Sequence, residues 1–499
     1  MIDMTVARIA EIVGGRLADI NPGDAATRHV TGTVEFDSRA VTAGGLFLAL
    51  PGARVDGHDF AAAAINSGAV AVLAARPVGV PAIVVPPAPP SDAHAGVLEH
   101  DTRGEGAAVL AALGRLAAAV AAELSADGLR IIGITGSSGK TSTKDMIAAV
   151  LRPLGEVVAP PGSFNNELGH PWTVLRATAG TDFLVLEMSA RHPGNIAALA
   201  RIAPPSIAAV LNVGTAHLGE FGSREAIAAT KAELVEAVGA SGAVILNVDD
   251  PAVAAMAGQT RARVVRVGRT GDADVRAEQI ELDDLARPSF TLVAAGRRVP
   301  VTLAVHGEHQ VSNALCAAAV ALECGATPEQ VAAALSTAGP ASRHRMEVHT
   351  RADGVTVVND AYNANPDSMR AGLQALAVMA RRGGSPRRSW AVLGEMGELG
   401  EDAVTEHDRI GRLAVRLDIT RLVVVGTGRP MSAMHHGAVM EGSWGSESTM
   451  VADADAALEL LRAELQSGDV VLVKASNAAG LGALAEALVS DQPAQDQDS

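Results

Sequence analysis

The sequence predicts an α/β protein with a small N-terminal α/β domain and two larger domains built on parallel sheets. Its 499 residues are too many for one core, because a domain takes roughly 100–200 residues. From residue 129 onward, short β-branched and aliphatic runs alternate with longer amphipathic patterns, which is typical of βαβ units. Aromatic residues make up only 2% of the chain, so Ala, Val and Leu must fill thin helix–sheet layers.

Two changes of composition divide the chain. A Pro-rich stretch at residues 77–96 ends the N-terminal domain, and an Ala- and Leu-rich helix at about 106–124 leads into the next one. Further on, a helix ends in Gly339-Pro340. We therefore predict domains at residues 1–103, 104–339 and 340–499, and we expect the polar tail, about 491–499, to be disordered.

Eight apolar runs in the second and third domains predict parallel strands. In chain order they are LRIIGIT, TDFLVLEM, SIAAVLNV, GAVILNV, GVTVVND, SWAVLGEM, TRLVVVG and GDVVLVKAS. Ligands bind beyond the carboxyl ends of such strands, so the cleft between two sheet edges is the expected site. The polar residues at these ends are Thr135, Glu187, Asn212, Asp249, Asp360, Glu395 and Lys474.

The charge balance limits the classes of partner. The formal net charge of −16 is spread along the chain, which disfavours a nucleic-acid surface of clustered Lys and Arg. No uninterrupted apolar run reaches the roughly 18 residues of a membrane span, and the charged N-terminal segment does not fit a signal peptide. Cys316 and Cys324 lie too far apart in one helical stretch for a disulfide. We expect a cytoplasmic protein.

The segment TGSSGKTS predicts a phosphate-binding loop between the strand IIGIT and a helix over residues 140–151. Its glycines let backbone N–H groups face an anion, Lys140 can reach β- and γ-phosphates, and Thr141 can hold Mg²⁺. Ile134 stands where the usual spacing has Gly, so a glycine-rich turn without nucleotide is the alternative. The loop residues predicted to bind nucleotide are Thr135, Gly136, Ser137, Ser138, Gly139, Lys140 and Thr141.

Two polar residues near this loop are candidate metal partners. Glu187 ends an apolar strand, where an unpaired carboxylate is costly unless a cation lies beside it. Mg²⁺ fits that position because it prefers hard oxygen ligands. His217 follows the next strand, and although a lone loop histidine is usually unremarkable, its neighbours at the sheet edge favour a role in the site.

Lys231 lies on the apolar stripe of a helix expected over about 224–238. Ile227, Leu234 and Val235 share that stripe, while the acidic residues of the helix point elsewhere. A buried ammonium is costly and tends to become neutral. The alternative is a lysine that extends along the edge of the stripe and keeps its charge in water.

Taken together, these segments resemble the Mur ligase family. The resemblance covers nearly the whole chain, except the Pro-rich stretch and the tail, and NDAYNANPDSM is its most discriminating motif. It separates members that add a terminal dipeptide from those that add earlier amino acids. The other matching segments are FDSRAVTAGGLFLALPGARVDGHDF, TGSSGKTS, FNNELGHPWT, LEMSARHPGNI, NVGTAHLGEFGSREAIAATKAEL, HGEHQVSNALCAAAVAL and LGEMGELG.

The resemblance implies a fold and a reaction. The fold would comprise a UDP-binding N-terminal domain, a central P-loop ATPase-type domain with a parallel or mixed sheet, and a C-terminal Rossmann-like domain. ATP would phosphorylate the terminal carboxylate of UDP-N-acetylmuramoyl-tripeptide, and the amine of D-alanyl-D-alanine would attack the acyl phosphate. Two Mg²⁺ ions would be held by Thr141, Glu187, His217 and Lys231, the lysine as a carbamate. We expect a monomer without membrane insertion.

The resemblance also implies roles for individual residues. The catalytic set would be Lys140, Glu187, His217, Lys231 and Arg343. Nucleotide contacts beyond the loop would come from Asn313 at the adenine and from Arg343, Asp360, Tyr362 and Asn363 of the C-terminal domain. The substrate would be bound by Asp37, Ser38, Arg39, Gly57 and His58 at the uridine diphosphate end and by Asn165, Asn166 and Ser189 at the muramoyl peptide. The alternative for the asparagine pair is a turn.

Some positions depart from the family pattern, and three other functions compete. His170 and Trp172 replace smaller apolar residues, Asn359 stands where aspartate is common, and Ala475 stands in a KASN ending where KGS is usual. The competing functions are a related ligase with an amino-acid acceptor, such as an earlier Mur enzyme or a folylpolyglutamate synthase; a redox enzyme; and a non-catalytic nucleotide-binding scaffold. The segment GTGRP lacks the full dinucleotide-binding pattern, which disfavours redox chemistry.

Overall fold

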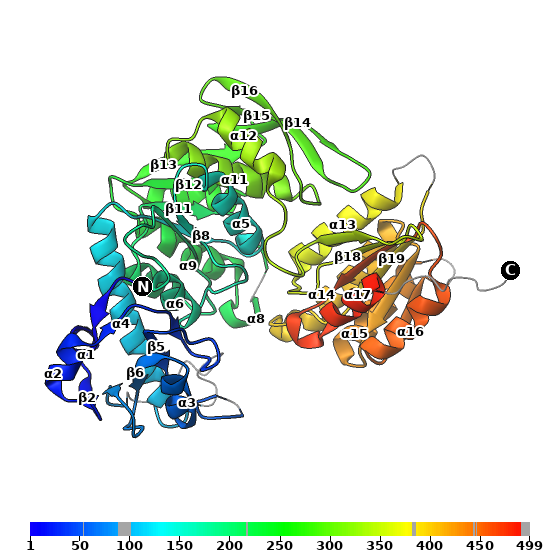
Figure 1. Cartoon of the computed structure of the whole chain (residues 1–499). Coiled ribbons are helices and arrows are strands. Elements are labelled where there is room, and N and C mark those ends of the chain that lie inside the picture. The colour runs from blue at the N-terminus through cyan, green and yellow to red at the C-terminus, as the bar shows by residue number, and fades with distance from the viewer. Residues whose placement is uncertain are drawn as a thin grey trace.

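The computed structural model describes residues 1–52, 54–87, 101–215, 218–381, 386–442, 445 and 447–490. Three α/β units follow one another along the chain, coloured blue, cyan to green, and yellow to red in Figure 1. The predicted α/β class with three units is thereby confirmed. The predicted disordered tail, 491–499, and residues 88–96 of the Pro-rich stretch lie outside the described residues.

The N-terminal unit is a five-stranded sheet with short helices around it. The strand order is β2-β7-β6-β5-β4, and β1 and β3 pair separately as a two-stranded ribbon. Its strands are β1 (Met4–Thr5), β2 (Arg16–Ala18), β3 (His29–Val30), β4 (Val34–Glu35), β5 (Gly45–Leu48), β6 (Ala69–Ala74) and β7 (Ala82–Val84). Its helices are α1 (Val6–Val13), α2 (Pro22–Thr27), η1 (Gly57–Phe60) and α3 (Ala61–Asn66).

Helix α4 (Glu105–Ala126) joins the N-terminal and central units. It packs against α1 and β6 of the first unit and against α6 and α7 of the second. By length and composition it could cross a membrane, but 61% of its most apolar stretch is buried against these elements. It is therefore a core helix, and one hydrophobic core runs from Leu73 through Leu113 to Leu186.

The central unit is a nine-stranded mixed sheet in the order β16-β15-β14-β13-β12-β11-β8-β10-β9. Strands β9 to β13 pair in parallel with β8 and with one another, whereas β14, β15 and β16 form an antiparallel arm. Four of these strands, β8, β10, β11 and β12, were predicted from the sequence, whereas β9, β13 and the arm were not. The strands are β8 (Arg130–Thr135), β9 (Val157–Val158), β10 (Phe183–Glu187), β11 (Ile207–Val210), β12 (Ala243–Asn247), β13 (Arg263–Gly268), β14 (Val275–Leu282), β15 (Pro288–Ala294) and β16 (Arg297–Thr302).

Helices cover both faces of this sheet. The helix predicted over 140–151 is α5, with those bounds, and the helix predicted over about 224–238 is α9, which ends two residues earlier. The helices are α5 (Lys140–Leu151), α6 (Gly169–Val174), α7 (Asn195–Ile202), α8 (Leu218–Phe221), α9 (Arg224–Glu236), α10 (Pro251–Ala254), η2 (Ala255–Gln259), α11 (Gln310–Glu323) and α12 (Pro328–Thr337).

The C-terminal unit is a six-stranded sheet in the order β17-β18-β22-β19-β20-β21, parallel except for the edge strand β17. All four runs predicted here are strands. The four predicted strands are β18 (Thr356–Asn359), β19 (Ser389–Leu393), β20 (Arg421–Val425) and β22 (Val470–Lys474). The two strands that were not predicted are β17 (Glu347–Thr350) and β21 (Ser448–Val451). The helices are α13 (Pro366–Arg381), η3 (Gly400–Asp402), α14 (Ala403–Arg416), α15 (Arg429–Glu441), α16 (Ala454–Glu464), η4 (Asn477–Ala479) and α17 (Leu481–Ser490).

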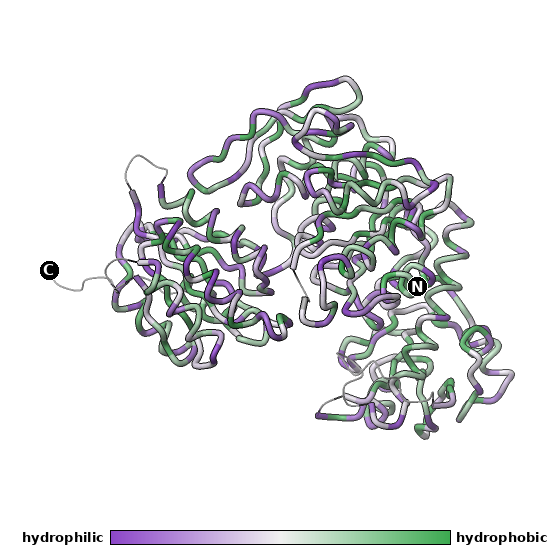
Figure 2. Tube along the Cα trace, turned by 180° about the vertical axis from the view of Figure 1, so that it is seen from behind, coloured by the Kyte–Doolittle hydropathy of each residue, from purple (hydrophilic) through white to green (hydrophobic). Residues whose placement is uncertain are grey.

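The pairing register brings polar strand ends together. Glu187 lies opposite Ile134, and Val210 lies opposite Thr135, so the ends of β8, β10 and β11 form one edge. In Figure 2 hydrophobic stretches of the chain run through the inside of each unit, and many hydrophilic stretches lie at its periphery. The carboxyl edges of the central and C-terminal sheets line one cleft, as predicted.

Candidate active site

The phosphate loop lies where β8 passes into α5. Gly139 has φ +83°, and a Cβ there would stand 2.6 Å from Asn313 Oδ1, so only glycine fits. Asn212 holds the loop: its Oδ1 accepts from the Ser138 N–H at 2.9 Å, and its Nδ2 donates to Ser138 O at 3.2 Å. No side chain caps the start of α5, so the backbone N–H groups of its first turn are available to a phosphate.

Lys140 turns back onto the loop. Its Nζ donates to Gly136 O at 2.6 Å. Burial lowers the pKa of Lys140, while the carboxylate of Glu187 acts in the opposite direction. A buried cation held by one carbonyl is suited to an anionic ligand, because a phosphate would compensate its charge.

Glu187 shows the fit of this site to a divalent cation. Its Oε2 accepts from Thr141 Oγ1 at 3.3 Å and from Ser163 Oγ at 3.0 Å. Its Oε1 is buried without a hydrogen-bond partner among the described residues, as are the hydroxyls of Thr135 and Thr215. Such orphaned hard oxygens beside a phosphate loop fit Mg²⁺, so the donor set present is compatible with that ion.

Lys231 is buried on α9, together with Ile227, Leu234 and Val235. Burial and, secondarily, the charge of Lys140 lower its pKa well below the usual value. Within the described part of the chain, the side-chain amine of Lys231 has no hydrogen bond or ion pair. This environment favours a neutral amine over a lysine that extends into water. His217, its predicted companion, lies outside the described residues.

The C-terminal unit supplies the opposite wall of the cleft. Lys474 and Asp360 form a buried ion pair at 2.6 Å, and Lys474 Nζ also donates to Asn363 O at 2.9 Å. Burial lowers the pKa of Lys474, and Asp360 opposes that shift. The residues lining the cleft are Ser138, Gly139, Ser142, Leu211, Asn212, Asn247, Arg269, His309, Gln310, Ser312, Asn313, Arg345, Met346, Asp360, Asp367, Ser368, Ala371 and Lys474.

Of the two arginines in the segment 343–345, Arg345 lines the cleft and the predicted Arg343 does not. Arg343 points away from the cleft, with its side chain 77% exposed and paired with Glu486 at 2.6 Å. Arg345 occupies the expected place: it lies over the Tyr362 ring at 4.2 Å and donates to Thr141 Oγ1 at 3.3 Å. The sequence placed both in the same segment, but it did not show which one turns inward, because that depends on the backbone path.

The predicted peptide-binding residues surround Ser163. Asn165 Nδ2 donates to Ser163 Oγ at 2.7 Å, and Asn165 O accepts from the Ser189 N–H at 3.2 Å. Asn166 Oδ1 accepts from the Gly169 N–H at 2.9 Å, a contact that is typical of a turn. Ser163 was missed, because a lone serine in a Pro- and Gly-containing loop carries no signal in the sequence.

His170 and Trp172, which depart from the family pattern, lie in helix α6. His170 is fully buried, which lowers its pKa to about 4. Trp172 reaches the N-terminal unit, where its Nε1 donates to Glu35 Oε2 at 3.3 Å and its ring meets Phe36 edge-on with centroids 6.0 Å apart. Phe164 packs on the same indole ring. Trp172 therefore ties the first two units together.

In the N-terminal unit, the predicted residues lie in two places. Asp37 and Arg39 form an exposed ion pair at 2.7 Å, next to Ser38, and Arg39 lowers the pKa of Asp37 to about 2. Gly57 stands where a Cβ would lie 2.6 Å from the backbone of Leu50. His58 is buried below it.

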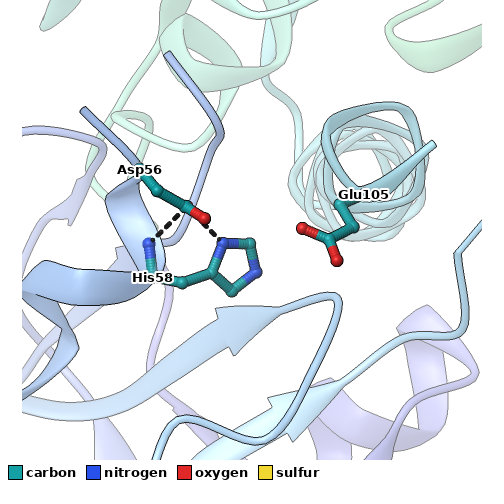
Figure 3. A group of neighbouring side chains, drawn as sticks. All are labelled: Asp56, His58 and Glu105. Carbon is teal, nitrogen blue, oxygen red and sulfur yellow. Dashed lines mark hydrogen bonds and ion pairs between the residues drawn. The ribbon is translucent and has the colours of Figure 1, made fainter. Parts of the chain in front are cut away.

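Figure 3 shows the neighbouring side chains of Asp56, His58 and Glu105. One potential ligand atom of each lies within 4.8 Å of the others, a spacing that a metal site requires. Both ring nitrogens of His58 are nevertheless engaged: Nε2 accepts from the Ala75 N–H at 3.2 Å, so Nδ1 carries the proton toward Asp56 at 2.7 Å. Arg76 balances both carboxylates, at 2.8 Å from Asp56 and 3.8 Å from Glu105. The cluster therefore does not fit a metal ion, because it offers no free imidazole nitrogen.

Family comparisons agree with this arrangement. A family model described as "Mur ligase middle domain" matches residues 134–321, one described as "Mur ligase, glutamate ligase domain" matches residues 344–477, and one described as "Mur ligase family, catalytic domain" matches residues 31–120. Together they cover most of the chain.

Individual relatives are similar over their whole length. The UDP-N-acetylmuramoyl-tripeptide–D-alanyl-D-alanine ligase of Mycobacterium tuberculosis is 74% identical, with 98% of each chain covered, and that of Bacillus subtilis is 34% identical, with 98% and 99% covered. Among solved structures, MurF from Acinetobacter baumannii has a TM-score of 0.81 at 29% identity, covering 98% of this chain and 99% of that one. MurF ligase from Thermotoga maritima in complex with ADP has a TM-score of 0.73 at 28% identity, with 92% and 97% covered.

Proposed function

The chain belongs to the Mur ligase family, and from that premise we propose that it joins D-alanyl-D-alanine to UDP-N-acetylmuramoyl-tripeptide at the cost of ATP. The products are the pentapeptide precursor of peptidoglycan, ADP and phosphate. The observation that carries the proposal is the cleft in which the phosphate loop faces Arg345, Asp360 and Lys474, with Glu187 joined to the loop helix through Thr141. The 74% identity to a UDP-N-acetylmuramoyl-tripeptide–D-alanyl-D-alanine ligase, over 98% of that relative, supports the proposal.

The proposed chemistry has two steps. A carboxylate oxygen of the tripeptide forms a bond to the γ-phosphorus of ATP while the bond to the ADP oxygen breaks, giving an acyl phosphate. The free amine of the dipeptide then attacks the acyl carbon, a proton leaves the nitrogen, and phosphate departs with the former carboxylate oxygen. Phosphoryl transfer depends mainly on positioning and charge neutralisation, so the protein's contribution is to place charges.

The residues of the cleft take roles in these steps. The N–H groups at the start of α5 and the ammonium of Lys140 hold the phosphates, and Arg345 faces them from the other side. Thr141 and Glu187 would hold one Mg²⁺, and His217 with Lys231 as a carbamate would hold a second. These ions, when bound, neutralise charge on the transferring phosphoryl group. The buried, low-pKa amine of Lys231 supports the carbamate, because only a neutral amine captures CO₂.

Other contacts complete the proposal. Asn313, which touches the loop at Gly139, would contact adenine, and Asp360, Tyr362 and Asn363 would approach the nucleotide from the C-terminal unit. The uridine diphosphate end would bind at Asp37, Ser38, Arg39, Gly57 and His58, and the muramoyl peptide at Asn165, Asn166 and Ser189.

The larger organisation is proposed on the same basis. The domains would be residues 1–103, 104–339 and 340–499, with α4 contributing to the cores of the first two. An acyl phosphate hydrolyses when water reaches it, so the three domains would close around the substrates. We propose that the enzyme acts as a monomer in the cytoplasm.

The acceptor tests the proposal against its nearest rival, a ligase that uses an amino acid. Phosphate release is measured with ATP, UDP-N-acetylmuramoyl-tripeptide and, in turn, D-alanyl-D-alanine, D-alanine, L-lysine or L-glutamate. We expect turnover with the dipeptide and less than about a hundredth of that rate with the single amino acids. Preferred turnover with an amino acid would make the chain a different ligase, and nucleotide binding without turnover would make it a scaffold.

A further inference from the structure

Behind the phosphate loop, four residues close a ring of polar contacts. Lys144 Nζ donates to Gly162 O at 2.9 Å, and the Gly162 N–H donates to Ser342 Oγ at 3.0 Å. The Ser342 N–H donates to Asp145 Oδ2 at 3.0 Å, and Asp145 Oδ1 lies 3.0 Å from Lys144 Nζ. The ring therefore joins α5, the loop 160–163 and residues 338–346, which connect the central and C-terminal units.

The ring is buried and internally balanced. The side chains of Lys144 and Asp145 are 3% and 10% exposed, and Ser342 is buried. Lys144 Nζ donates to two carbonyl oxygens, Gly162 O and, at 2.6 Å, Pro160 O, and its charge is paired with Asp145. It also lies 4.0 Å from Glu187 Oε1, so it acts on that oxygen through its charge.

Two members of the ring, Gly162 and Ser342, are close in sequence to residues of the candidate active site. Ser163, the residue after Gly162, donates to Glu187 Oε2 and accepts from Asn165. Three residues after Ser342, Arg345 reaches Thr141. A shift of the connection 338–346 would therefore move the arginine at the phosphates and, through Gly162, the serine at Glu187.

We propose that Lys144, Asp145 and Ser342 are positioning residues that couple the placement of the C-terminal unit to Glu187 and the peptide-binding loop. The inference rests on the proposed ligase function. Opening the ring leaves the phosphate loop intact, so it affects the peptide substrate and turnover more than ADP binding. Because the contacts form one closed ring, a second break adds little to the first.

The experiment compares wild type with Ser342→Ala, Asp145→Asn and the double variant. Each single variant is expected to raise KM for UDP-N-acetylmuramoyl-tripeptide and lower kcat, for a combined loss of about tenfold in kcat/KM. The double variant should lose no more than about twice the larger single loss. The dissociation constant of ADP, measured by calorimetry, should stay within about twofold of wild type.

Ser336→Ala is the matched control, since among the described residues Ser336 Oγ donates within α12, to Ala332 O. It should leave kcat/KM within about twofold. The coupling would be overturned if the ring variants kept the wild-type kcat/KM, or if the two single losses multiplied in the double variant. It would also be overturned if kcat/KM fell only in variants whose melting midpoint had dropped to the assay temperature. An inactive wild type would instead refute the ligase function, so the two failures are distinguishable.

Discussion

Arg345 Nη2 donates to Thr141 Oγ1 at 3.3 Å, which joins the segment leading into the C-terminal sheet to the first turn of the phosphate-loop helix. The same guanidinium lies over the ring of Tyr362, the only tyrosine of the chain. Thr141 in turn contacts Glu187. One arginine therefore brings positive charge from the third unit to the point where phosphate and cation would meet.

Replacing this arginine should distinguish it from its neighbour. Arg345→Ala should lower kcat by about 10²–10³-fold, because a charge facing the transferring phosphoryl group is lost. Arg343→Ala should stay within about twofold, since it removes only an exposed ion pair with Glu486. Steady-state kinetics of both purified variants test this, and the reverse ranking would return Arg343 to the site.

The loop lysine should be needed for turnover but not for folding. Lys140→Ala removes a charge held by one carbonyl, Gly136 O, and leaves the hydrophobic cores untouched. We expect turnover to fall by at least about 10³-fold, with an unchanged circular dichroism spectrum. A folded variant with near-normal turnover would exclude the loop from the mechanism.

Lys231 should carry a carbamate. The amine is buried and its pKa is low, so CO₂ can add to it near neutral pH. In ¹³CO₂-labelled protein, NMR should show a carbamate carbon that is absent from Lys231→Ala and Lys231→Arg. Both variants should lose most activity.

Short carboxylic acids should restore part of the activity to Lys231→Ala but not to Lys231→Arg, whose guanidinium stays cationic in that space. A Lys231→Arg variant with wild-type turnover would show that Lys231 contributes only a charge to the helix.

His170 should make stability depend on pH. Burial lowers its folded-state pKa to about 4, whereas in the unfolded chain it is about 6.5, so the unfolded state binds more protons between these values. Stability is therefore lost as pH falls through this window. This residue should contribute about 2 kcal/mol of loss between about pH 7.5 and about pH 5.

His170→Leu removes the titrating group and should shrink the difference in unfolding free energy between those two pH values by that amount. Urea titrations of both proteins provide the measurement. An unchanged difference would mean that His170 is protonated in the folded protein or hydrated there.

The sequence predicted the elements whose signals are local. The phosphate loop has a glycine that must adopt φ +83°, and the strands around it are continuous apolar runs, so both follow from composition and spacing. Lys231 could be identified because helical periodicity alone places it on the buried stripe.

The features that the sequence did not predict depend on tertiary contacts. Arg343 and Arg345 are two positions apart, and the left-handed backbone at His344 and Met346 decides which one turns inward. Lys144 resembles any helix lysine until the loop 160–163 folds over it. The strands β14 and β16 carry many polar residues between apolar ones, so they lack the continuous apolar runs that indicate a buried parallel sheet.

The central claim, transfer of the γ-phosphoryl group to the peptide carboxylate, is tested most directly with ¹⁸O. UDP-N-acetylmuramoyl-tripeptide labelled in its terminal carboxylate is converted with ATP and D-alanyl-D-alanine, and the released phosphate is analysed by mass spectrometry. The proposed acyl phosphate predicts one ¹⁸O atom in each phosphate formed, because the P–O bond to the former carboxylate oxygen survives. Unlabelled phosphate accompanied by amide product would contradict carboxylate phosphorylation and with it the mechanism proposed for this cleft.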